Sequence, residues 1–408
     1  MNNWKDLYWG DLITLEYGKP CPNYADNIGE YPVFGTNGKI GQSKKALCNH
    51  PSVIIGRKGA YRGVHYSDKP FWVIDTAFYL EPKVDIDLKW AYYNLLTQDI
   101  NGMDSGSAIP STSRQDFYFL SVKLPPLSEQ KAIAHILSSL DDKIELNRQM
   151  NETLEAMARA IFKSWFVDFD PVRAKSSGRQ PAGMDTATAD LFPDEFEESS
   201  LGLIPKGWKI KALPEFIEIN PKRSLAKGKI APYLDMKNMP TQGHRPDDWI
   251  DRPFGSGTKF INGDTLMARI TPCLENGKTA FVDFLQDKQV CWGSTEYIIF
   301  RSKPPLPLEF AYYLARHEEF KTFAIQNMTG SSGRQRTPAD CFHQYLIAVP
   351  SEQVALKFGD LVEPLMVMIS ANSEQSQNLI NLRDTLLPKL MSGEIRVKEA
   401  EKIINDKL

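Results

Sequence analysis

The chain has 408 residues, 42% of them hydrophobic, which is enough for two or three globular domains, and no apolar run is long enough to span a bilayer. The net charge of −3, taken over the whole chain, gives no sign of a polyanionic partner. Five cysteines without a Cys-x-x-Cys pair and six histidines without a His-Glu-x-x-His motif argue for free thiols in a reducing cytoplasm and against a disulfide framework or a metal site.

The first segment, residues 1–126, reads as a globular domain with a net charge of 0. Short β-rich runs at 52–56 and 72–80 lie between Gly, Pro, Asn and Asp turn signals, and one helix is expected at 87–98. These features predict a mixed α+β domain in which strands dominate.

The stretch 31–41, YPVFGTNGKIG, carries a glycine at every third position after an apolar run and so resembles a phosphate-binding loop. A phosphate loop opens a helix whose N-terminus binds the anion, but the residues after Gly41 form a short segment that ends in proline before another strand. The glycines are therefore interpreted as turn residues.

After two prolines the hydrophobic period becomes that of a helix, and residues 128–167 are predicted to form one helix about 60 Å long at 1.5 Å per residue. Its seam residues alternate spacings of three and four, as in a coiled coil. Within segment 127–167, this spacer helix is expected to pair through Leu140, Ile144, Asn147, Asn151, Leu154, Ile161 and Trp165.

The second half of the chain repeats this order. Residues 168–200, rich in Pro, Ser, Gly and acidic residues, are predicted to form an irregular acidic connector that returns the chain. A second α+β domain is expected at 201–349, with a net charge of +5 and a helix at 307–320. A second spacer helix at 350–391 precedes a C-terminal tail at 392–408. The seam of this helix comprises Phe358, Leu361, Leu365, Asn372, Gln375, Leu379, Leu382 and Leu386.

Four blocks recur in the same order and indicate a tandem duplication. Trp72 precedes Trp292 by 220 positions. In the second copy FAYYLAR corresponds to WAYYNLL, TGSSGRQRTPAD corresponds to SGSAIPSTSRQD, and IAVPSEQ corresponds to LPPLSEQ. Both seams place polar residues near mid-helix, so antiparallel pairing would bring these residues together and fix the register. The alternative is that each helix packs on its own domain and these side chains face solvent.

The repeated blocks also carry a family resemblance. They include IIGRKGAYRG and WVIDTAFYL in the first copy and LMARITPCLENGKTAF and GSTEYIIF in the second, together with LPPLSEQ, AIFKSWFVDFDPV, LGLIPKGWK and LLPKLMSGEI. With these blocks, the chain resembles the specificity (S) subunit of a type I restriction–modification system over essentially its whole length.

The resemblance implies an α+β fold with two tandem, strand-rich target-recognition domains, separated by two long antiparallel helices that form a coiled coil with pseudo-twofold symmetry. It also implies a non-catalytic DNA-binding subunit for host defence, in which each domain reads one half of a bipartite double-stranded DNA target. The implied partners are two methyltransferase (M) subunits, which use S-adenosylmethionine for adenine-N6 methylation, and restriction (R) subunits, which use ATP and Mg. No cofactor is therefore expected in this chain, and no membrane partner.

A domain that reads duplex DNA needs phosphate anchors and side chains that reach base edges. Four segments meet this need: the glycine-flanked basic stretch GRKGAYRG, its counterpart at 269–278, and two small-residue loops with basic ends, SGSAIPSTSR and TGSSGRQR. Each of them could also be a solvated turn or loop. The candidate DNA-binding residues are Thr36, Asn37, Lys39, Arg57, Lys58, Tyr61, Arg62, Ser105, Ser107, Arg114, Lys237, Asn238, Arg269, Asn276, Lys278, Ser331, Ser332, Arg334, Gln335 and Arg336.

Three other functions stay open from the residues alone. They are a specificity subunit of a related, type IIB-like system with a bipartite site, a nucleotide-binding enzyme that uses the glycine loop at 35–41, and a coiled-coil structural protein without DNA affinity. The sequence contains no GxxxxGK[ST] loop, no Asn-Pro-Pro-aromatic run and no paired-carboxylate nuclease motif. No catalytic residue is therefore predicted.

Overall fold

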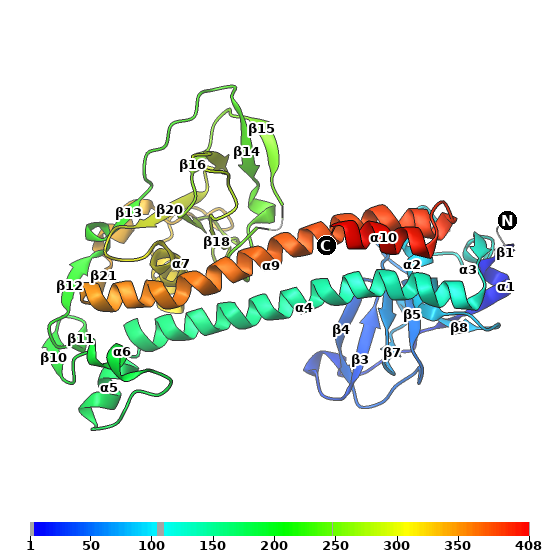
Figure 1. Ribbon diagram of the computed structural model, residues 1–408, viewed down its shortest axis with the longest axis horizontal. Helices are drawn as coiled ribbons and strands as arrows, with labels where there is room; N and C mark the ends of the chain where they lie inside the picture. Colours follow the sequence, from blue (N-terminus) through cyan, green and yellow to red (C-terminus); the bar gives the residue numbers. More distant parts are fainter. Residues whose placement is uncertain (1–3, 104–109, 247, 408) are drawn as a thin grey trace. The chain divides into compact units, whose positions relative to one another are not determined.

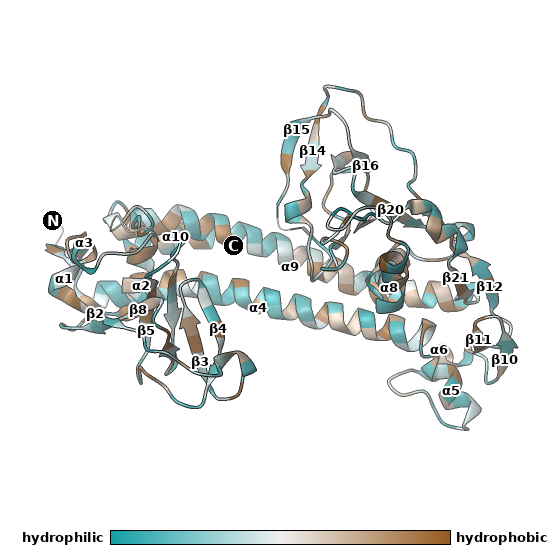
Figure 2. Ribbon diagram, turned by 180° about the vertical axis from the view of Figure 1, so that it is seen from behind, coloured by the Kyte–Doolittle hydropathy of each residue, from teal (hydrophilic) through white to brown (hydrophobic). Residues whose placement is uncertain are grey.

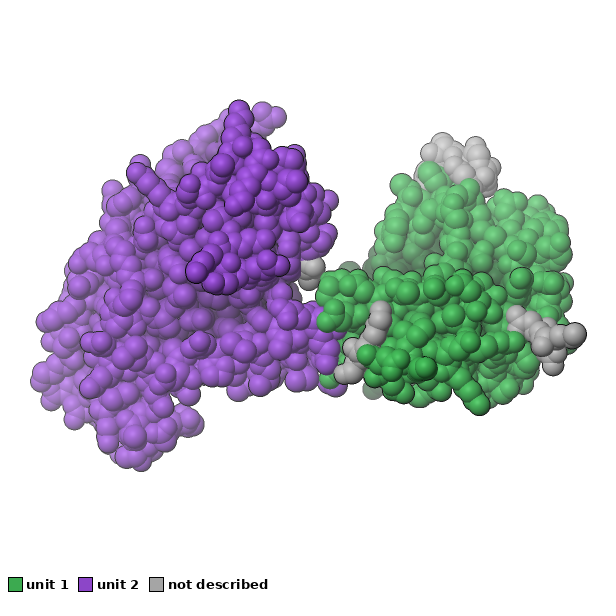
Figure 3. Space-filling view, turned by 45° about the horizontal axis from the view of Figure 1, so that its top comes forward, with its two compact units in different colours: residues 1–145, 376–408 green, residues 146–375 purple. Residues whose placement is uncertain are grey.

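The chain folds into two compact units, each of which contains one half of both long helices. A computed structural model describes residues 4–103, 110–246 and 248–407. One unit comprises residues 1–145 and 376–408, and the other comprises residues 146–375 (Figure 3). No helix in the described ranges is both long and apolar enough to cross a bilayer.

The first unit contains three small sheets with the strand orders β2-β8-β5-β6, β4-β3-β7 and β1-β9. All neighbouring strands are antiparallel except β3 and β7, which are parallel. The strands are β1 (Lys5–Tyr8), β2 (Ile13–Tyr17), β3 (Tyr31–Gly35), β4 (Gly38–Ser43), β5 (Ser52–Gly56), β6 (Val64–Ser67), β7 (Trp72–Val73), β8 (Ala77–Pro82) and β9 (Ser121–Leu124).

Helices close the core of the first unit. The Asp87 side chain caps helix α2 by accepting a hydrogen bond from the Trp90 N–H (2.8 Å), and the buried Trp90 ring then stacks on Trp9 at 6.3 Å between centroids. The helices are α1 (Trp9–Leu12), α2 (Leu88–Leu96), α3 (Arg114–Tyr118), α10 (Val397–Lys407), a 3₁₀ turn at Tyr24–Asp26 and halves of α4 (Leu127–Phe166) and α9 (Glu352–Ser392).

The second unit has two four-stranded sheets, β13-β20-β17-β18 and β15-β14-β19-β16, and the two-stranded antiparallel pairs β12-β21 and β10-β11. The strands are β10 (Phe196–Ser199), β11 (Gly202–Pro205), β12 (Lys209–Ala212), β13 (Ile217–Ile219), β14 (Ile230–Leu234), β15 (Ile250–Pro253), β16 (Thr258–Phe260), β17 (Thr265–Ala268), β18 (Thr279–Phe281), β19 (Cys291–Gly293), β20 (Tyr297–Ser302) and β21 (Leu346–Val349). The helices are α5 (Asp170–Ser176), α6 (Thr186–Asp190), α7 (Leu308–Arg316), α8 (Glu318–Gln326) and 3₁₀ turns at Leu213–Glu215, Met236–Asn238 and Ala339–Gln344.

The two domains share one pattern of strand pairing. Strand β8 lies between β2 and β5 as β20 lies between β13 and β17, and the parallel pair β3–β7 corresponds to β14–β19. In these pairs Val33 lies opposite Trp72, and Tyr233 lies opposite Trp292. The prediction of a duplicated, strand-rich α+β domain is confirmed.

The two long helices run antiparallel in both units (Figure 1). In the first unit, Leu137 of α4 and Leu386 of α9 share one buried core, and Asp141 pairs with Arg383 at 2.7 Å. In the second unit, Phe162 of α4 packs against Phe358 of α9 at 6.1 Å between ring centroids. The predicted spacer helices are confirmed, because α4 and α9 match the expected ranges within two residues at each end.

The polar residues of the two seams meet in the second unit. The Asn147 amide donates to Gln375 Oε1 (3.0 Å), and the Asn372 amide donates to Asn151 Oδ1 (2.9 Å). Polar groups inside a helix pair favour the one register in which they satisfy each other. The expected antiparallel contact is therefore confirmed, and packing of each helix on its own domain alone is excluded.

One predicted seam residue is corrected. Leu361 is 37% exposed, whereas Val362, Met366 and Ile369 are buried, so between residues 361 and 369 the buried side of α9 runs one position later than the predicted 3–4 alternation. Figure 2 shows hydrophilic and hydrophobic residues alternating along both long helices, which explains why more than one apolar stripe could be read from the sequence.

The segments predicted to be irregular contain secondary structure. The connector forms α5, α6 and β10, and buries Val172 and Phe192, whose ring lies 5.0 Å from Trp165. The C-terminal tail forms α10, in which Ala400 is buried in the core of the first unit. Composition suggested a linker, but scattered apolar residues and a proline at the start of α5 were enough to form short packed helices.

Candidate nucleic-acid interface

Three predicted segments of the first unit converge through backbone contacts. The Thr36 hydroxyl donates to the carbonyl oxygens of Lys58 (2.9 Å) and Thr76 (2.8 Å). The Gly59 N–H donates to Pro110 O (2.9 Å), and the Thr112 N–H donates to Arg57 O (2.9 Å). The 36–37 turn, the loop after β5 and the segment before α3 therefore form one connected loop cluster.

The 31–41 stretch itself is a hairpin. Strand β3 ends at Gly35, strand β4 begins at Gly38, and Thr36 and Asn37 form the turn between them. Gly38 has φ +109°, a conformation that side-chain-bearing residues rarely adopt. No helix follows, so this hairpin lacks the strand–loop–helix geometry of a phosphate loop.

Two arginines of the loop cluster stack on one tyrosine. The guanidinium of Arg57 lies 4.9 Å from the Tyr17 ring centroid, and that of Arg114 lies 4.8 Å from it. Arg114 also donates to the Tyr118 hydroxyl (3.1 Å). Neither guanidinium forms an ion pair with a carboxylate among the described residues. Two cationic groups at one aromatic ring, neither of them paired with a carboxylate among the described residues, favour an anionic partner such as phosphate.

Exposed side chains of the same cluster surround these arginines. Asn37, Lys39 and Lys58 are exposed, and the Tyr61 side chain is 68% exposed. The Thr36 hydroxyl already makes two internal hydrogen bonds and stabilises the turn. The candidates Ser105 and Ser107 lie outside the described residues.

Arg62 is a correction, because its side chain is only 2% exposed. Its guanidinium donates to the carbonyl oxygens of Gly59 (3.2 Å), Ile100 (3.3 Å), Asn101 (2.7 Å) and Met103 (2.9 Å). A buried guanidinium whose two terminal nitrogens donate to backbone carbonyls holds loops together and has no surface for DNA.

The second unit repeats the backbone arrangement with different charges. The Thr337 N–H donates to Arg269 O (2.9 Å) as Thr112 does to Arg57, and the Arg269 N–H donates to Glu296 O (2.9 Å). Here, however, the Glu296 carboxylate accepts from Arg336 Nε (2.8 Å) and lies 4.0 Å from Arg269 Nε. The equivalent position in the first copy is Thr76, so the two loop clusters share a scaffold and differ in electrostatics.

The remaining candidates of the second unit divide into internally bonded and exposed residues. Lys278 donates to Met236 O (2.6 Å), and the Asn238 amide donates to Asp248 O (3.0 Å), so both stabilise neighbouring loops. The Gln335 carbonyl accepts from the Thr271 N–H (3.1 Å). The exposed candidates are Lys237, Asn276, Ser331, Ser332 and Arg334.

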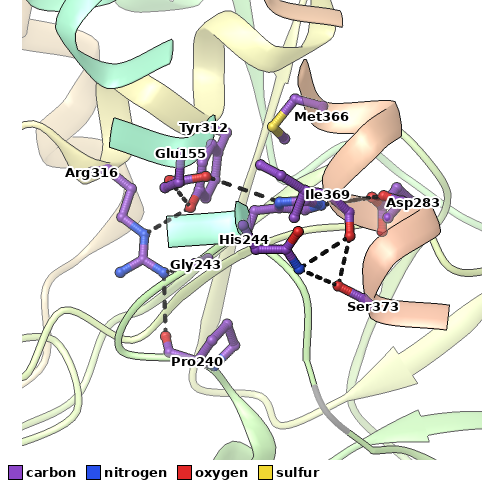
Figure 4. Close-up of polar contacts among 12 residues, drawn as sticks. Glu155, Pro240, Gly243, His244, Asp283, Tyr312, Arg316, Met366, Ile369 and Ser373 are labelled. Carbon is purple, nitrogen blue, oxygen red and sulfur yellow. Dashed lines mark hydrogen bonds and ion pairs between the residues drawn. The ribbon is translucent and has the colours of Figure 1, made fainter. Parts of the chain in front are cut away.

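A buried polar network joins the loop after Pro240 to both long helices (Figure 4). His244 is fully buried, and its Nε2 lies 2.7 Å from Asp283 Oδ2, while its Nδ1 lies 4.0 Å from Glu155 Oε2 of α4. Asp283 also accepts a hydrogen bond from Ser370 of α9. Burial alone would raise the pKa of Asp283, but hydrogen bonds from His244 and Ser370 and the charge of Arg245 hold it below its usual value.

Helix α7 completes this network. The Tyr312 hydroxyl donates to Glu155 Oε1 (2.7 Å) and accepts from Arg316 Nε (3.2 Å). Arg316 also donates to the carbonyl oxygens of Thr241 (2.7 Å) and Gly277 (2.9 Å). Because one arginine bonds both loops, the turn containing Asn276 and Lys278 is fixed relative to the helices within this unit.

Comparisons with known proteins agree with this architecture. Residues 1–156 match the family model described as the type I restriction modification DNA specificity domain. The HindI specificity subunit of Haemophilus influenzae is 26% identical over 97% of this chain and 100% of its own length, and the MjaIX specificity subunit of Methanocaldococcus jannaschii is 26% identical over 96% and 89%. By sequence, the chain is similar to type I restriction-enzyme specificity subunits over nearly its whole length.

The fold is also similar to that of a solved structure. The crystal structure of the S subunit from M. genitalium superposes with a TM-score of 0.60 at 18% identity, over 96% of both chains. The sequence reasoning missed Tyr17, the shared platform for two arginines, and Glu296, the counter-ion in the second copy. The sequence could have indicated Glu296 in one way only: aligning the two copies places this carboxylate at the position of Thr76.

Proposed function

We propose that the chain is the non-catalytic DNA-reading subunit of a type I restriction–modification complex, and that each globular domain reads one half of a split double-stranded site. The observation that carries this proposal is the pair of loop clusters. Both use the same backbone hydrogen bond, Thr112 to Arg57 and Thr337 to Arg269, but present different side chains. A duplicated scaffold with divergent loops suits two half-sites of different sequence.

The proposed readout has two parts. Arg57, Arg114, Lys39 and Lys58 would anchor phosphates in the first domain, because they are cationic and lie in or beside one loop cluster. In the second domain Arg334 and Arg336 lie on the corresponding loop, and Arg336 pairs with Glu296. A carboxylate such as that of Glu296 can accept a hydrogen bond from cytosine N4, and an arginine beside it can contact guanine.

The helices are proposed to scaffold two adenine-N6 methyltransferase subunits and, through them, ATP-dependent restriction subunits. Several large apolar side chains of the helix pair are exposed in the second unit: Leu146, Met150, Met157, Leu356, Val367 and Met368. Exposed apolar residues grouped on one helix pair favour a protein partner. S-adenosylmethionine, ATP and Mg would then be bound by the partners.

The test is to purify the chain with its candidate methyltransferase subunits and to map methylated adenines in host DNA by long-read sequencing. A split motif is expected, and replacing residues 1–126 with those of a relative should change one half of it only. Absence of modification together with absence of a complex would refute the proposal. A complex that methylates a continuous motif would refute the two-domain readout.

A further inference from the structure

Three side chains with metal-ligand chemistry meet at one corner of the first unit. Cys48 is buried, and its Sγ lies 3.5 Å from His50 Nε2. The same Nε2 lies 3.0 and 3.1 Å from the two carboxylate oxygens of Glu81, at the end of β8. All three ligand atoms lie within 4.8 Å of one another. The fold thus gathers a thiol, an imidazole and a carboxylate from a loop and a strand.

The orientation of His50 suits metal binding. Its Nδ1 lies 2.9 Å from Pro51 O, so in a metal-bound form Nδ1–H would donate to this carbonyl while the Nε2 lone pair pointed toward Cys48 and Glu81. A ligating histidine ordinarily donates its second N–H to a carbonyl or carboxylate in this way.

The duplicated domain shows what occupies the equivalent corner in the second copy. The strand registers place Phe260 at the position of Cys48, Asn262 at that of His50 and Arg301 at that of Glu81. There the fully buried Asp264 accepts from Arg301 (2.7 Å) and lies 3.0 Å from Arg223.

The second copy therefore supplies its own cations where the first copy gathers ligand atoms. Glu81 stands where the second copy has Arg301, and among the described residues its one ion-pair partner is His50. A bound cation would balance the carboxylate in the first copy as two guanidinium groups do in the second.

We propose that Cys48, His50 and Glu81 bind one zinc ion. Tetrahedral zinc with Zn–S near 2.3 Å and Zn–N near 2.0–2.1 Å separates sulfur from nitrogen by about 3.5 Å, which is the observed Cys48–His50 distance. On binding, the Cys48 thiol loses its proton to solvent and the sulfur bonds to the metal, and the fourth position is left to water.

The ion would tie two parts of the domain together. Cys48 exchanges backbone hydrogen bonds with Phe71 (3.0 Å each), directly before β7, and His50 leads into β5, whose far end carries Arg57. The proposed site lies outside the proposed DNA-reading loops. The proposal revises the expectation of no metal site. That expectation rested on closely spaced ligand motifs, and Glu81 lies 31 residues from His50 in the sequence.

The test uses the full chain and cobalt(II) as a spectroscopic probe, followed by zinc in competition with a chromophoric chelator. We expect one ion per chain and a cobalt–thiolate charge-transfer band, with affinity at least ~10-fold lower in Cys48→Ser and His50→Ala. Cys21→Ser, which removes another thiol of the same unit, should bind like the parent chain.

Glu81→Arg separates metal binding from folding. It installs the residue type that the second copy uses, so the variant should fold, judged by circular dichroism, and should not bind zinc. A missing thiolate band in the parent chain would overturn the proposal, as would a band that persists in Cys48→Ser. Equal zinc affinity of Glu81→Arg and the parent chain would also overturn it.

Discussion

Arg57 and Arg62 lie on one loop, yet their surroundings give them opposite roles. Arg57 stacks on Tyr17 and keeps a surface, whereas Arg62 donates to buried carbonyls. Arg336 takes a third role, because Glu296 neutralises it. At the scale of single residues, the charge of an arginine is set by sequence, but its availability to DNA is set by the aromatic, carbonyl or carboxylate group that the fold places beside it.

The stacked pair yields a prediction for DNA binding. Arg57→Ala and Arg114→Ala should each weaken binding of the assembled complex at all sequences and reduce the salt dependence of log K by about 1, because each would release one phosphate contact. Fluorescence anisotropy at several salt concentrations measures both quantities. Arg173→Ala is the matched control, since Arg173 also stacks on an aromatic ring (Phe196, 5.4 Å) but lies in the connector. An unchanged slope in both loop variants would contradict the assignment.

At the scale of elements, the periodicity of the long helices predicted their existence, ends and polar contacts, but only part of their buried face. Helical period and caps are local properties, so α4 and α9 could be read from the chain. Which of several apolar stripes is buried depends on the partner helix, and therefore Val362 and Met366 were missed in favour of Leu361. Likewise, the loops that form the interface could be located from glycines and charges, whereas Tyr17 could not, because only tertiary packing brings it there.

The corrected seam can be tested by a matched pair of leucine truncations. Leu379 is 1% exposed in the core of the first unit and Leu361 is 37% exposed. Leu379→Ala should lower the free energy of unfolding by about 2–5 kcal/mol, while Leu361→Ala should change it by about 0.5 kcal/mol or less. Urea denaturation measures both. Equal losses for the two variants would show that the predicted seam, and not the corrected one, is buried.

At the scale of the whole molecule, each compact unit has its own hydrophobic core, although both long helices pass through the two units. The core of the first unit includes Trp90 and Leu386, and that of the second includes Phe162 and Tyr313. Local opening of one unit should therefore leave the other protected.

Asp283 offers a test of this independence. Its depressed pKa contributes stability that is present above the unfolded value of about 3.9 and is lost as pH falls through the folded value. At neutral pH, Asp283→Asn should cost about 1–3 kcal/mol. Hydrogen exchange should quicken in residues 146–375 and stay unchanged in the first unit. Equal acceleration in both units would show a single cooperative structure instead.

The division of the chain into units also sets an order of events during synthesis. Residues 146–375 are contiguous, whereas the first unit needs residues 376–408, including α10 with its buried Ala400. Domains fold as they leave the ribosome, and usually the N-terminal one folds first. Here the later-made unit has all its residues while the earlier-made one still lacks α10 and its half of α9. Part of the core of the first unit therefore stays uncovered until residues 376–408 have been made.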